Sequence, residues 1–496
     1  MITYEADIAV LGAGFAGSLS ALILHQMGLR CLLIDRTAHP RFAIGESSTP
    51  IANMVLRDLA VRYDLPRLLP LTKYGPWQQT YPHLVAGRKR GFSYFSHADG
   101  HAFVPHADHR NELLVAASNK DERADTHWLR ADVDAFLAAE AKAAGIPVLE
   151  NTTLKQLMPA RPWLLTGTTD GTPLQIKARF VVDASGGGGA LQSALSLPDT
   201  AEGLHTRSRT LFSHFTGVAR WQSLLNAGGA VTADHPFSCD DAALHHLLDG
   251  GWMWMLRFNN DLVSAGLVLD TQRHPLNPAV SAEEEWAAMM ARYPALNRQF
   301  EDAGIARSPG ALIRTGALQR RIAQAAGPNW AMLPHTAGFI DPLHSTGIAH
   351  SLCGVERLML VLKAHWDRPT LPDALSAYDA AIQLELAFID RLVACCYAAI
   401  PDFQLFTAAS MLYFAATVAY ERGRAKVQGV PFDRLYLCAD ETPLFDAAGT
   451  ALERLKAGDT ADAFSAFVEQ AVAPYNTAGL FHPAVPNMYH HTVAPG

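Results

Sequence analysis

The feature that most constrains this chain is a glycine-rich turn between a short strand and a helix near the N-terminus. Residues 12–17 read GAGFAG, which matches the pattern G-x-G-x-x-G. An apolar run at 8–11 precedes the turn, and an apolar segment of helix length follows it at 15–27. A second apolar run at 30–34 then ends at Asp35. This order predicts one βαβ unit with a parallel sheet.

Each glycine of this turn has its own physical task. Gly12 permits the tight turn, Gly14 lets the backbone approach a pyrophosphate, and Gly17 lets the helix lie close to the sheet. The helix N-terminus attracts phosphate groups. Asp35 stands where it can accept hydrogen bonds from ribose hydroxyls. The pattern predicts a dinucleotide-binding domain, whereas a purely structural glycine turn leaves Asp35 unexplained.

A second strand signal decides which dinucleotide is expected. The apolar residues 180–182 run into the turn sequence DASG, which begins at Asp183. A similar turn in flavoproteins of this fold brings a second strand edge to the cofactor, which favours FAD over NAD. A strand-ending aspartate alone is weaker evidence, because it is often only a helix cap. Between the two strand signals, residues 128–145 are expected to form a helix and 146–149 a strand.

The rest of the chain divides into a strand-rich part and a helical part. Trp252, Trp254, Leu256 and Phe258 alternate with other residues, so they are expected on one face of a strand. The turn signal NND at 259–261 predicts a hairpin with the returning strand at 262–269. We therefore expect an α/β core over residues 1–370, with a strand-rich insertion at about 205–320, and a mainly helical region over 371–496.

Composition and charge exclude several classes of function. The 496 residues are 49% hydrophobic and carry a net charge of -8, which argues against a protein that binds nucleic acid through bulk positive charge. The six cysteines form no C-x-x-C pair, so we expect a reducing, cytoplasmic setting. The uncharged run 403–420 is alanine-rich and contains polar side chains, so we interpret it as a buried helix rather than a membrane span.

A histidine-rich segment and a short basic run are the remaining clusters of polar residues considered for function. His101, His106, Asp108 and His109 match no standard ligand spacing, so no metal site is expected. The basic run at 88–90 is interpreted as a solvated loop, with docking of an acidic carrier protein as the alternative.

Five motifs in order resemble the flavin-dependent halogenase family, the group that contains the tryptophan halogenases. Besides the glycine turn, the chain has GESSTP at 45–50, Lys73, WMWM at 252–255 and FIDPLHSTG at 339–347. The family patterns are G-E-[AS]-[ST]-x-P, a lysine about thirty residues on, W-x-W-x-I-P and F-x-x-P-x-x-S-x-G. The resemblance covers about residues 5–360 and implies a Rossmann-type, glutathione-reductase-like FAD-binding domain.

The resemblance implies that reduced FAD and oxygen convert halide into hypohalous acid, which Lys73 holds as a hydrogen-bonded acid or as a haloamine. A buried lysine suits this task because burial lowers its pKa. The alternative is a surface lysine whose stem packs on Trp77. Glu46 is implied to orient Lys73 or to take the ring proton; its alternative is a dipole partner at a helix start.

Other residues receive roles from the same resemblance. Thr346 and Gly347 resemble the halide site of the family. Successive backbone N–H groups in such a turn form a nest that can bind an anion. A helix cap at this turn is the alternative. Trp252 and Trp254 lie near the flavin in the family, and a core role has equal weight. His344 replaces a glutamate of the tryptophan halogenases, so free tryptophan is not the expected substrate. The histidine is either a proton carrier or a packed polar residue.

The resemblance also implies a set of FAD contacts. They are Gly12, Gly14, Ala16, Gly17, Asp35, Arg36, Ser47, Ser48, Thr49, Arg130, Asp183 and Ile348. Thr49 and Pro50 are in addition a good N-cap and first helical residue.

The predicted function is chlorination or bromination of a small electron-rich aromatic such as an indole, phenol or pyrrole, either free or bound to a carrier. No second G-x-G-x-x-G for a nicotinamide is visible, so a separate flavin reductase is expected as partner. A flavin monooxygenase is the alternative, kept open by Leu256-Arg257 and Pro334-His335 where the family pattern differs. A third hypothesis is a non-enzymatic flavin-binding protein. Lys73 and the STG sequence at 345–347 argue against it, because such a protein does not need them. The helical C-terminal region is expected to cover the substrate.

Overall fold

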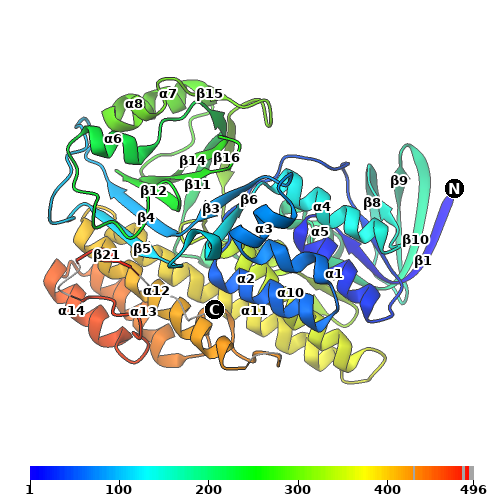
Figure 1. Ribbon diagram of the computed structural model, residues 1–496. Helices are drawn as coiled ribbons and strands as arrows, with labels where there is room; N and C mark the ends of the chain where they lie inside the picture. Colours follow the sequence, from blue (N-terminus) through cyan, green and yellow to red (C-terminus); the bar gives the residue numbers. More distant parts are fainter. Residues whose placement is uncertain (428–429, 483–485, 491–496) are drawn as a thin grey trace.

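The computed structural model describes residues 1–427, 430–482 and 486–490. Figure 1 shows two large sheets side by side and a layer of long helices packed beneath both. The first sheet carries the N-terminal βαβ unit, and the second is capped on its far side by three short helices.

The first sheet is the predicted dinucleotide-binding sheet. Its strand order is β18 (Ala326–Gly327), β19 (Trp330–Met332), β10 (Thr172–Asp183), β1 (Ile2–Leu11), β2 (Cys31–Ile34) and β7 (Val148–Leu149), and β8 (Thr152–Met158) and β9 (Trp163–Thr169) extend from β10 as an antiparallel ribbon. Strand β1 pairs in parallel with both β2 and β10. Helices α1 (Phe15–Gln26) and α4 (Arg130–Ala143) pack beside it. The predicted strand–turn–helix–strand unit is confirmed.

Register brings the predicted nucleotide turns to one edge of this sheet. Leu11 is paired with Ile34 on one side and with Asp183 on the other. Parallel strands place their carboxyl ends at the same edge, where ligands bind in open α/β sheets. The glycine turn, Asp35 and the DASG turn therefore meet there.

The second sheet contains the predicted tryptophan hairpin. Its order is β15 (Gly304–Ile305), β11 (Ser208–Thr216), β14 (Val263–Asp270), β13 (Gly251–Arg257), β12 (Ala243–Leu248), β4 (Gly91–Ser96), β5 (Glu112–Ala116) and β21 (Met488–Tyr489), with β16 (Ile313–Ala317) on β11. Strands β13 and β14 are antiparallel, as expected. Three strands of the sheet, β4, β5 and β21, come from outside the expected insertion at 205–320. Helices α6 (Trp221–Ala227), α7 (Ala282–Arg292) and α8 (Pro294–Gln299) form the cap.

Two small ribbons join the sheets to the helices. Strand β3 (Ala86–Lys89) pairs antiparallel with β6 (Asp125–Trp128), and β17 (Arg320–Arg321) pairs with β20 (Gly338–Phe339). The interpretation of residues 88–90 as a solvated loop is wrong. Arg88 and Lys89 belong to β3, and Lys89 is fully buried.

Helices form most of the remaining chain. They are α2 (Pro50–Arg62), α3 (Tyr74–Thr80), α5 (Ala190–Leu195), α9 (Pro334–Ala337), α10 (Thr346–His365), α11 (Leu371–Ala399), α12 (Phe403–Ala425), α13 (Thr442–Lys456) and α14 (Ala461–Val472), with 3-10 turns η1 (Pro66–Thr72), η2 (Asp121–Arg123), η3 (Gly186–Gly188), η4 (Ala201–Gly203) and η5 (Tyr436–Cys438). Helix α12 is long and apolar enough to cross a membrane by length and composition, but 72% of its most apolar window is buried inside the molecule. It packs between α11 and α14 as a core helix.

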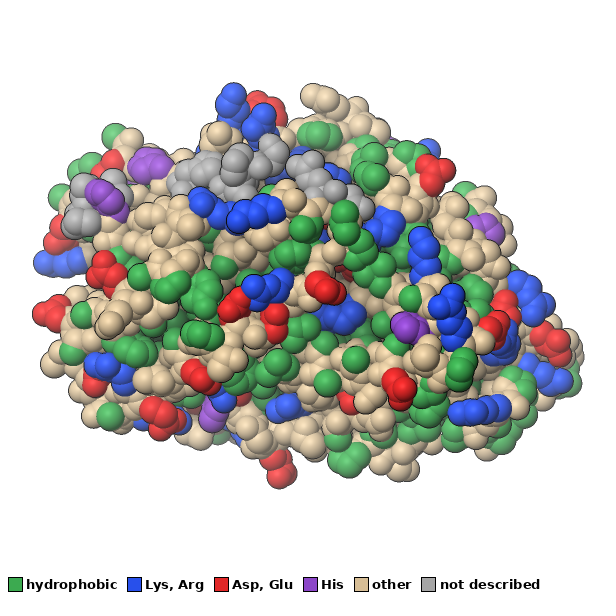
Figure 2. Space-filling view, turned by 90° about the horizontal axis from the view of Figure 1, so that it is seen from below, with side chains coloured by type: hydrophobic (Ala, Val, Ile, Leu, Met, Phe, Trp, Pro, Cys, Tyr) green, Lys and Arg blue, Asp and Glu red, His purple; other side chains and the backbone are tan. Residues whose placement is uncertain are grey.

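On the face shown in Figure 2, blue and red side chains are interspersed, and among the described residues neither sign gathers into one patch. All six cysteines are free and buried.

Candidate active site

A cavity of about 1300 Å³ runs from the nucleotide edge of the first sheet to the N-terminus of α10. The glycine turn, Asp35 and the DASG turn line one end. Phe212, Trp254 and Leu256 of the second sheet and the turn Ser345–Ile348 line the other. The two sheets and α10 therefore share one elongated site.

Close backbone contacts explain the glycines of the first turn. Gly12 has φ +98°, and a Cβ on it would lie 2.6 Å from the carbonyl oxygen of Ala184. A Cβ on Gly17 would lie 1.9 Å from the carbonyl oxygen of Gly12. Side chains at these positions would push the two turns and α1 apart, so the site depends on glycine there.

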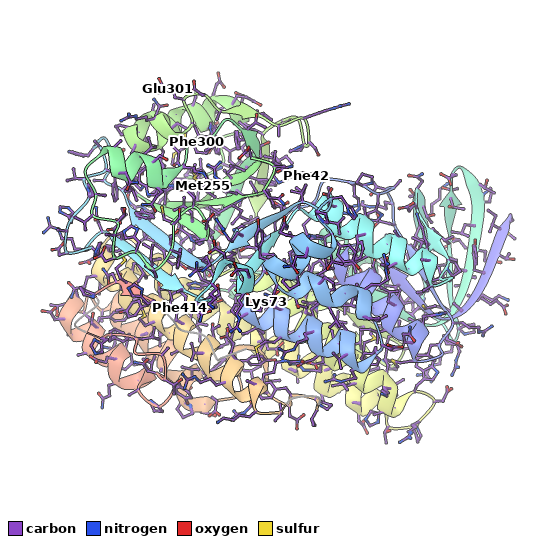
Figure 3. All side chains as sticks on the ribbon, viewed as in Figure 1. Phe42, Lys73, Met255, Phe300, Glu301 and Phe414 are labelled. Atoms are coloured by element: carbon purple, nitrogen blue, oxygen red, sulfur yellow. The ribbon has the colours of Figure 1, made fainter. Side chains whose placement is uncertain are left out.

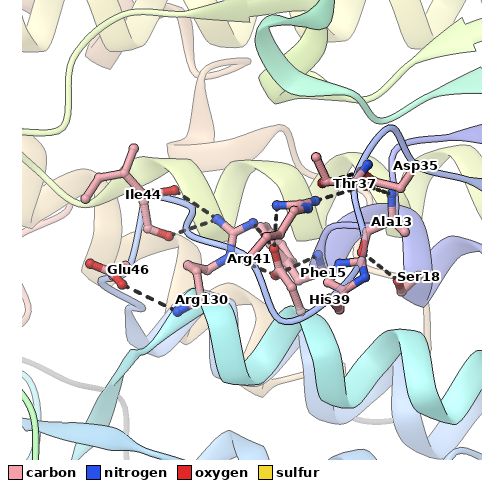
Figure 4. A network of polar contacts seen from close by, with 12 residues as sticks. Ala13, Phe15, Ser18, Asp35, Thr37, His39, Arg41, Ile44, Glu46 and Arg130 are labelled. Atoms are coloured by element: carbon pink, nitrogen blue, oxygen red, sulfur yellow. Dashed lines mark hydrogen bonds and ion pairs between the residues drawn. The ribbon is translucent and has the colours of Figure 1, made fainter. Parts of the chain in front are cut away.

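Asp35 is held by hydrogen bonds within the turn (Figure 4). Its side chain accepts from the backbone N–H of Ala13 at 2.8 Å and of Thr37 at 3.0 Å, and from Arg41 at 3.0 Å. Burial opposes ionisation, but the two backbone bonds and the Arg41 charge outweigh it and hold the pKa of Asp35 below its ordinary value. A permanent anion stands at the nucleotide end of the cavity.

Arg130 links the G-E-S-S segment to α4 (Figure 4). Its guanidinium makes two 2.9 Å bonds to Asp134 and donates to the carbonyls of Ile44 and Gly45 at 3.0 and 3.3 Å. Glu46 accepts from the backbone N–H of Arg130 at 3.4 Å, and its other oxygen lies 3.0 Å from His214 Nε2. Arg130 and Glu46 both line the cavity.

The predicted FAD residues fall into two groups, those that line the cavity and those that lie behind its lining. Gly12, Gly14, Ala16, Asp35, Arg36, Ser47, Arg130 and Ile348 line the cavity, whereas Gly17, Ser48, Thr49 and Asp183 stand behind it. Asp183 is fully buried and accepts from the N–H groups of Ser185 and Leu191, both at 3.0 Å, so it shapes the DASG turn. Burial raises its pKa. Thr49 is the N-cap residue of α2 as expected, but its side chain makes no capping bond.

The proposed halide turn is open to the cavity. Ser345 precedes α10 in the left-handed region, with φ +52°, and makes no side-chain cap. A Cβ on Gly347 would meet no atom within 4 Å. Gly347 and Ile348 line the cavity, and Thr346 is buried beside them. Backbone N–H groups at a helix start can hold a small anion, so the halide role of this turn stays a prediction.

The two tryptophans of β13 differ in position. Trp254 lines the cavity and donates to Ser264 Oγ at 3.2 Å. Trp252 is fully buried and donates to Tyr397 Oη at 3.0 Å, which in turn donates to Asp341 at 2.8 Å. Trp252 therefore stands in the core, and Trp254 stands in the wall.

His344 lies in the core, outside the cavity wall. Its ring stacks on Tyr413 at 4.2 Å, and its Nε2 lies 3.5 Å from Cys396 Sγ. Burial lowers its pKa to about 3. The ring is therefore neutral near pH 7, and this placement supports the packed polar residue rather than the proton carrier.

Lys73 lies between η1 and α3, near the centre of the molecule (Figure 3). Its side chain is 36% exposed, and its Nζ lies 3.7 Å from Asp125 Oδ1. The carboxylate placed beside Lys73 is thus Asp125. Glu46, which was expected there, has His214 and Arg130 as its hydrogen-bond partners.

A second lysine, which the sequence analysis placed in a solvated basic loop, meets the requirement of burial more fully. Lys89 Nζ donates to Ser47 Oγ at 2.9 Å and to the Ser48 carbonyl at 2.8 Å, and it lies 4.0 Å from the centre of the Phe92 ring. Burial lowers its pKa to about 7. Because Ser47 lines the cavity, Lys89 stands directly behind the wall. Its proximity to the G-E-S-S segment is set by the pairing of β3 and β6, which the spacing along the chain does not reveal.

The cavity fits a flavin dinucleotide. Its volume and its glycine turn suit a large ligand with a pyrophosphate. Residues 125–402 match the tryptophan halogenase family, and residues 7–236 match the FAD-binding domain family. The chain belongs to the tryptophan halogenase family. Members of this family are flavin-dependent halogenases, so the chain is an enzyme with FAD as its cofactor.

Relatives within the halogenases support this assignment. The chain is 30% identical over 478 residues to monodechloroaminopyrrolnitrin halogenase PrnC of Pseudomonas fluorescens, covering 91% of this chain and 82% of that protein. It is 29% identical over 353 residues to tetracycline 7-halogenase of Kitasatospora aureofaciens, and the match covers 70% of this chain and 61% of that protein. The crystal structure of halogenase PltM in complex with phloroglucinol and FAD shares the fold, with a TM-score of 0.85 at 23% identity over 99% of this chain and 100% of that chain.

Proposed function

We propose that this halogenase chlorinates or brominates a small electron-rich aromatic ring, and that a separate flavin reductase supplies its reduced FAD. The observation that carries the proposal is the single cavity that joins the nucleotide edge to the Ser345–Ile348 turn, with Lys89 directly behind its wall. When bound, reduced FAD together with oxygen supplies the oxidation that converts halide into hypohalous acid. The free, buried cysteines suit a cytoplasmic setting.

The wall residues hold the halide and exclude water. The N–H groups of Thr346 and Gly347, at the start of α10, bind the halide without a fixed countercharge. The side chains of Trp254 and Leu256 make the adjacent wall apolar, which strengthens the interaction of these N–H groups with an anion.

A lysine then presents the oxidised halogen to the substrate. An ammonium group donates a hydrogen bond to the oxygen of hypohalous acid. When the ring attacks the halogen, the oxygen–halogen bond breaks and the leaving hydroxide takes the ammonium proton as water. The ring proton then passes to a carboxylate, and a proton returns to the lysine. Both lysines are candidates. Lys89 is fully buried, whereas Lys73 is 36% exposed, so the field around Lys89 is less screened by water. We favour Lys89, and Lys73 stays a prediction.

Two carboxylates are candidates for accepting the ring proton. Asp125 is fully buried opposite Lys89 in the β3–β6 ribbon and lies 3.7 Å from Lys73. Burial raises its pKa, although the charges of both lysines oppose this. A carboxylate with a raised pKa is the better proton acceptor. Glu46, the residue predicted from the sequence, lines the cavity but is bonded to His214 and Arg130.

We favour a pyrrole-containing substrate among the electron-rich rings. The relative that matches 91% of the chain is named for a pyrrolnitrin-type substrate. Another is named 1H-pyrrole-2-carbonyl-[peptidyl-carrier protein] chlorinase, at 23% identity, so a carrier-bound pyrrole is the second form to test. The monooxygenase alternative loses one of its supports, because Arg257 donates to the carbonyls of Val218 and Ala219 instead of entering the cavity wall.

The decisive experiment is product mass spectrometry on the full chain. The protein is incubated with FAD, NADH, a flavin reductase, oxygen and bromide or chloride, with arylpyrroles, indoles, phenols and a carrier-bound pyrrole as substrates. Lys89→Met and Lys73→Met are assayed in parallel, and FAD binding by each variant is checked by absorbance. We expect a bromine isotope pair that Lys89→Met abolishes and Lys73→Met leaves.

Each other result assigns the reaction differently. Loss of product in Lys73→Met alone would return the catalytic role to Lys73. Halogenated product from both variants would point to free hypohalous acid and contradict a lysine step. A gain of oxygen that does not depend on halide would make the protein a monooxygenase.

A further inference from the structure

A cluster of ligand-type side chains lies on the second sheet, apart from the FAD cavity. Glu112 begins β5, His109 lies in the loop before it, and His235 lies in the connection between α6 and β12. One ligand atom from each of the three lies within 4.8 Å of the other two. None of them lines the FAD cavity.

The cluster leaves buried polar atoms without partners. The side chains of Glu112, His109 and His235 are 1%, 5% and 2% exposed. Both ring nitrogens of His235 and Oε2 of Glu112 make no hydrogen bond among the described residues, although His235 Nε2 approaches Glu112 Oε1 to 3.6 Å. A buried polar atom without a hydrogen bond is costly, so three such atoms close together point to a site that can bind a ligand.

Asp234 supplies the outer support that a metal-bound histidine requires. His109 Nδ1 faces Glu112 Oε1 at 2.5 Å, and His109 Nε2 lies 2.8 Å from Asp234 Oδ2. Metal-binding histidines usually donate their second ring N–H to a carboxylate, which fixes the tautomer and the ring orientation. Here Nε2–H would donate to Asp234, which leaves Nδ1 to face the ion.

We propose that His109, Glu112 and His235 form a binding site for a divalent transition metal, with zinc the best match. Two imidazoles and one carboxylate are ligands that zinc accepts, and a water completes the fourth position. The sequence predicted no metal here, because His235 is distant from His109 along the chain and only the fold brings them together.

A protonated His109 between two carboxylates is the alternative. Burial lowers the pKa of His109, but hydrogen bonds to Glu112 and Asp234 outweigh this and raise it. That arrangement accounts for His109 alone. It leaves the buried His235 ring with only a 3.6 Å contact from Nε2 to Glu112 Oε1, whereas a metal would bind one of its two nitrogens directly.

The site would act as a clip at the edge of the second sheet. It joins β5 to the connection that leads into β12. The carbonyl of His109 also accepts from Asn487 Nδ2 at 2.8 Å, next to the edge strand β21. Zinc would therefore raise the thermal stability of the protein without changing the chemistry at the FAD cavity.

Zinc binding to the FAD-loaded full chain tests the proposal. After dialysis against a chelator, zinc is titrated against a chromophoric competitor, and bound metal is counted by mass spectrometry. We expect one zinc per chain and a higher Tm. His235→Asn and Glu112→Gln should abolish binding, and Asp234→Asn should weaken it about 10- to 100-fold. His101→Ala, an exposed histidine of the same loop outside the cluster, is the matched control and should bind as the parent does.

The variants are first compared in the chelator to separate folding from binding. Variants that match the parent Tm without metal and lose only its rise with zinc support the site. The proposal fails if the parent takes up no zinc, if His235→Asn and Glu112→Gln bind as tightly as the parent, or if His101→Ala removes binding as well.

Discussion

At the scale of single residues, Lys89 and Lys73 differ in burial, and burial changes the pKa of a lysine. Lys89 has no exposed surface, whereas 36% of the Lys73 side chain is exposed. Burial lowers the pKa of Lys89 from 10.5 to about 7. Near neutral pH Lys89 therefore exists in both forms, one able to donate a hydrogen bond and one able to act as a nucleophile.

This pKa shift predicts how stability depends on pH. Between about pH 7 and 10.5 the unfolded chain holds a proton on Lys89 that the folded chain releases, so stability rises with pH in this window. Below pH 7 the folded protein carries the full cost of a buried charge. Lys89→Met should therefore raise Tm most below about pH 7, and its advantage should shrink towards pH 10.5.

Thermal melts of the parent, Lys89→Met and Lys73→Met across this pH range measure the effect. Lys73→Met is the control, because its side chain keeps contact with water. A Tm difference for Lys89→Met that stays constant with pH would contradict the shift.

The glycines of the cavity give a second prediction at this scale. Gly17→Ala should abolish FAD binding, because its Cβ would lie 1.9 Å from the Gly12 carbonyl oxygen. Gly347→Ala meets no atom within 4 Å, so it should fold and bind FAD while raising the KM for halide severalfold. FAD titration by fluorescence and halide-dependent turnover distinguish the two variants. Equal FAD affinity in Gly17→Ala and the parent would be incompatible with the close contact.

At the scale of elements, a buried ion-pair network ties three helices together. Arg424 of α12 makes 2.8 and 3.0 Å bonds to Glu356 of α10 and a 2.9 Å bond to Asp58 of α2, and Arg62 of α2 donates to the same glutamate at 2.8 Å. The side chains of Arg424 and Glu356 are 1% and 4% exposed. The network helps to set the position of α10, whose N-terminus carries the proposed halide turn.

Removing one charge from this network should be costly. Glu356→Gln leaves the buried Arg424 and the partly exposed Arg62 without the carboxylate charge that they share, and should destabilise the protein by about 3–5 kcal/mol. Denaturant unfolding measures this, with Glu453→Gln in the exposed pair with Lys456 as control. A loss no larger than that of the control would show that α10 is held by apolar packing instead.

The sequence predicted the elements better than it predicted the partners of their side chains. The βαβ unit and the tryptophan hairpin were predictable because each is encoded by a local pattern of apolar and turn residues. Lys89 and His235 were not, because their partners come from distant segments brought together by sheet pairing. His344 was assigned a role from its place in a motif, but its ring turns into the core against Tyr413.

At the scale of the whole molecule, the cavity has walls from both sheets and from α10. A ligand that spans these parts stabilises them together, by about 2.7 kcal/mol when its concentration is 100 times the Kd. The protein should therefore unfold in a single thermal transition, and its Tm should rise as the FAD concentration increases. Calorimetry with increasing FAD tests this, and Gly17→Ala should show no rise. Two separate transitions, with only one raised by FAD, would indicate that the sheets unfold independently.

The position of β21 has a consequence for synthesis of the protein. Met488 and Tyr489 pair with β5, whose own residues are made nearly four hundred positions earlier. During translation the edge of β5 stays unpaired until the ribosome has released residues 488–489, and an unpaired edge invites association with other chains. The edge of β5 therefore needs protection until late in synthesis, after the cofactor-binding sheet is already complete.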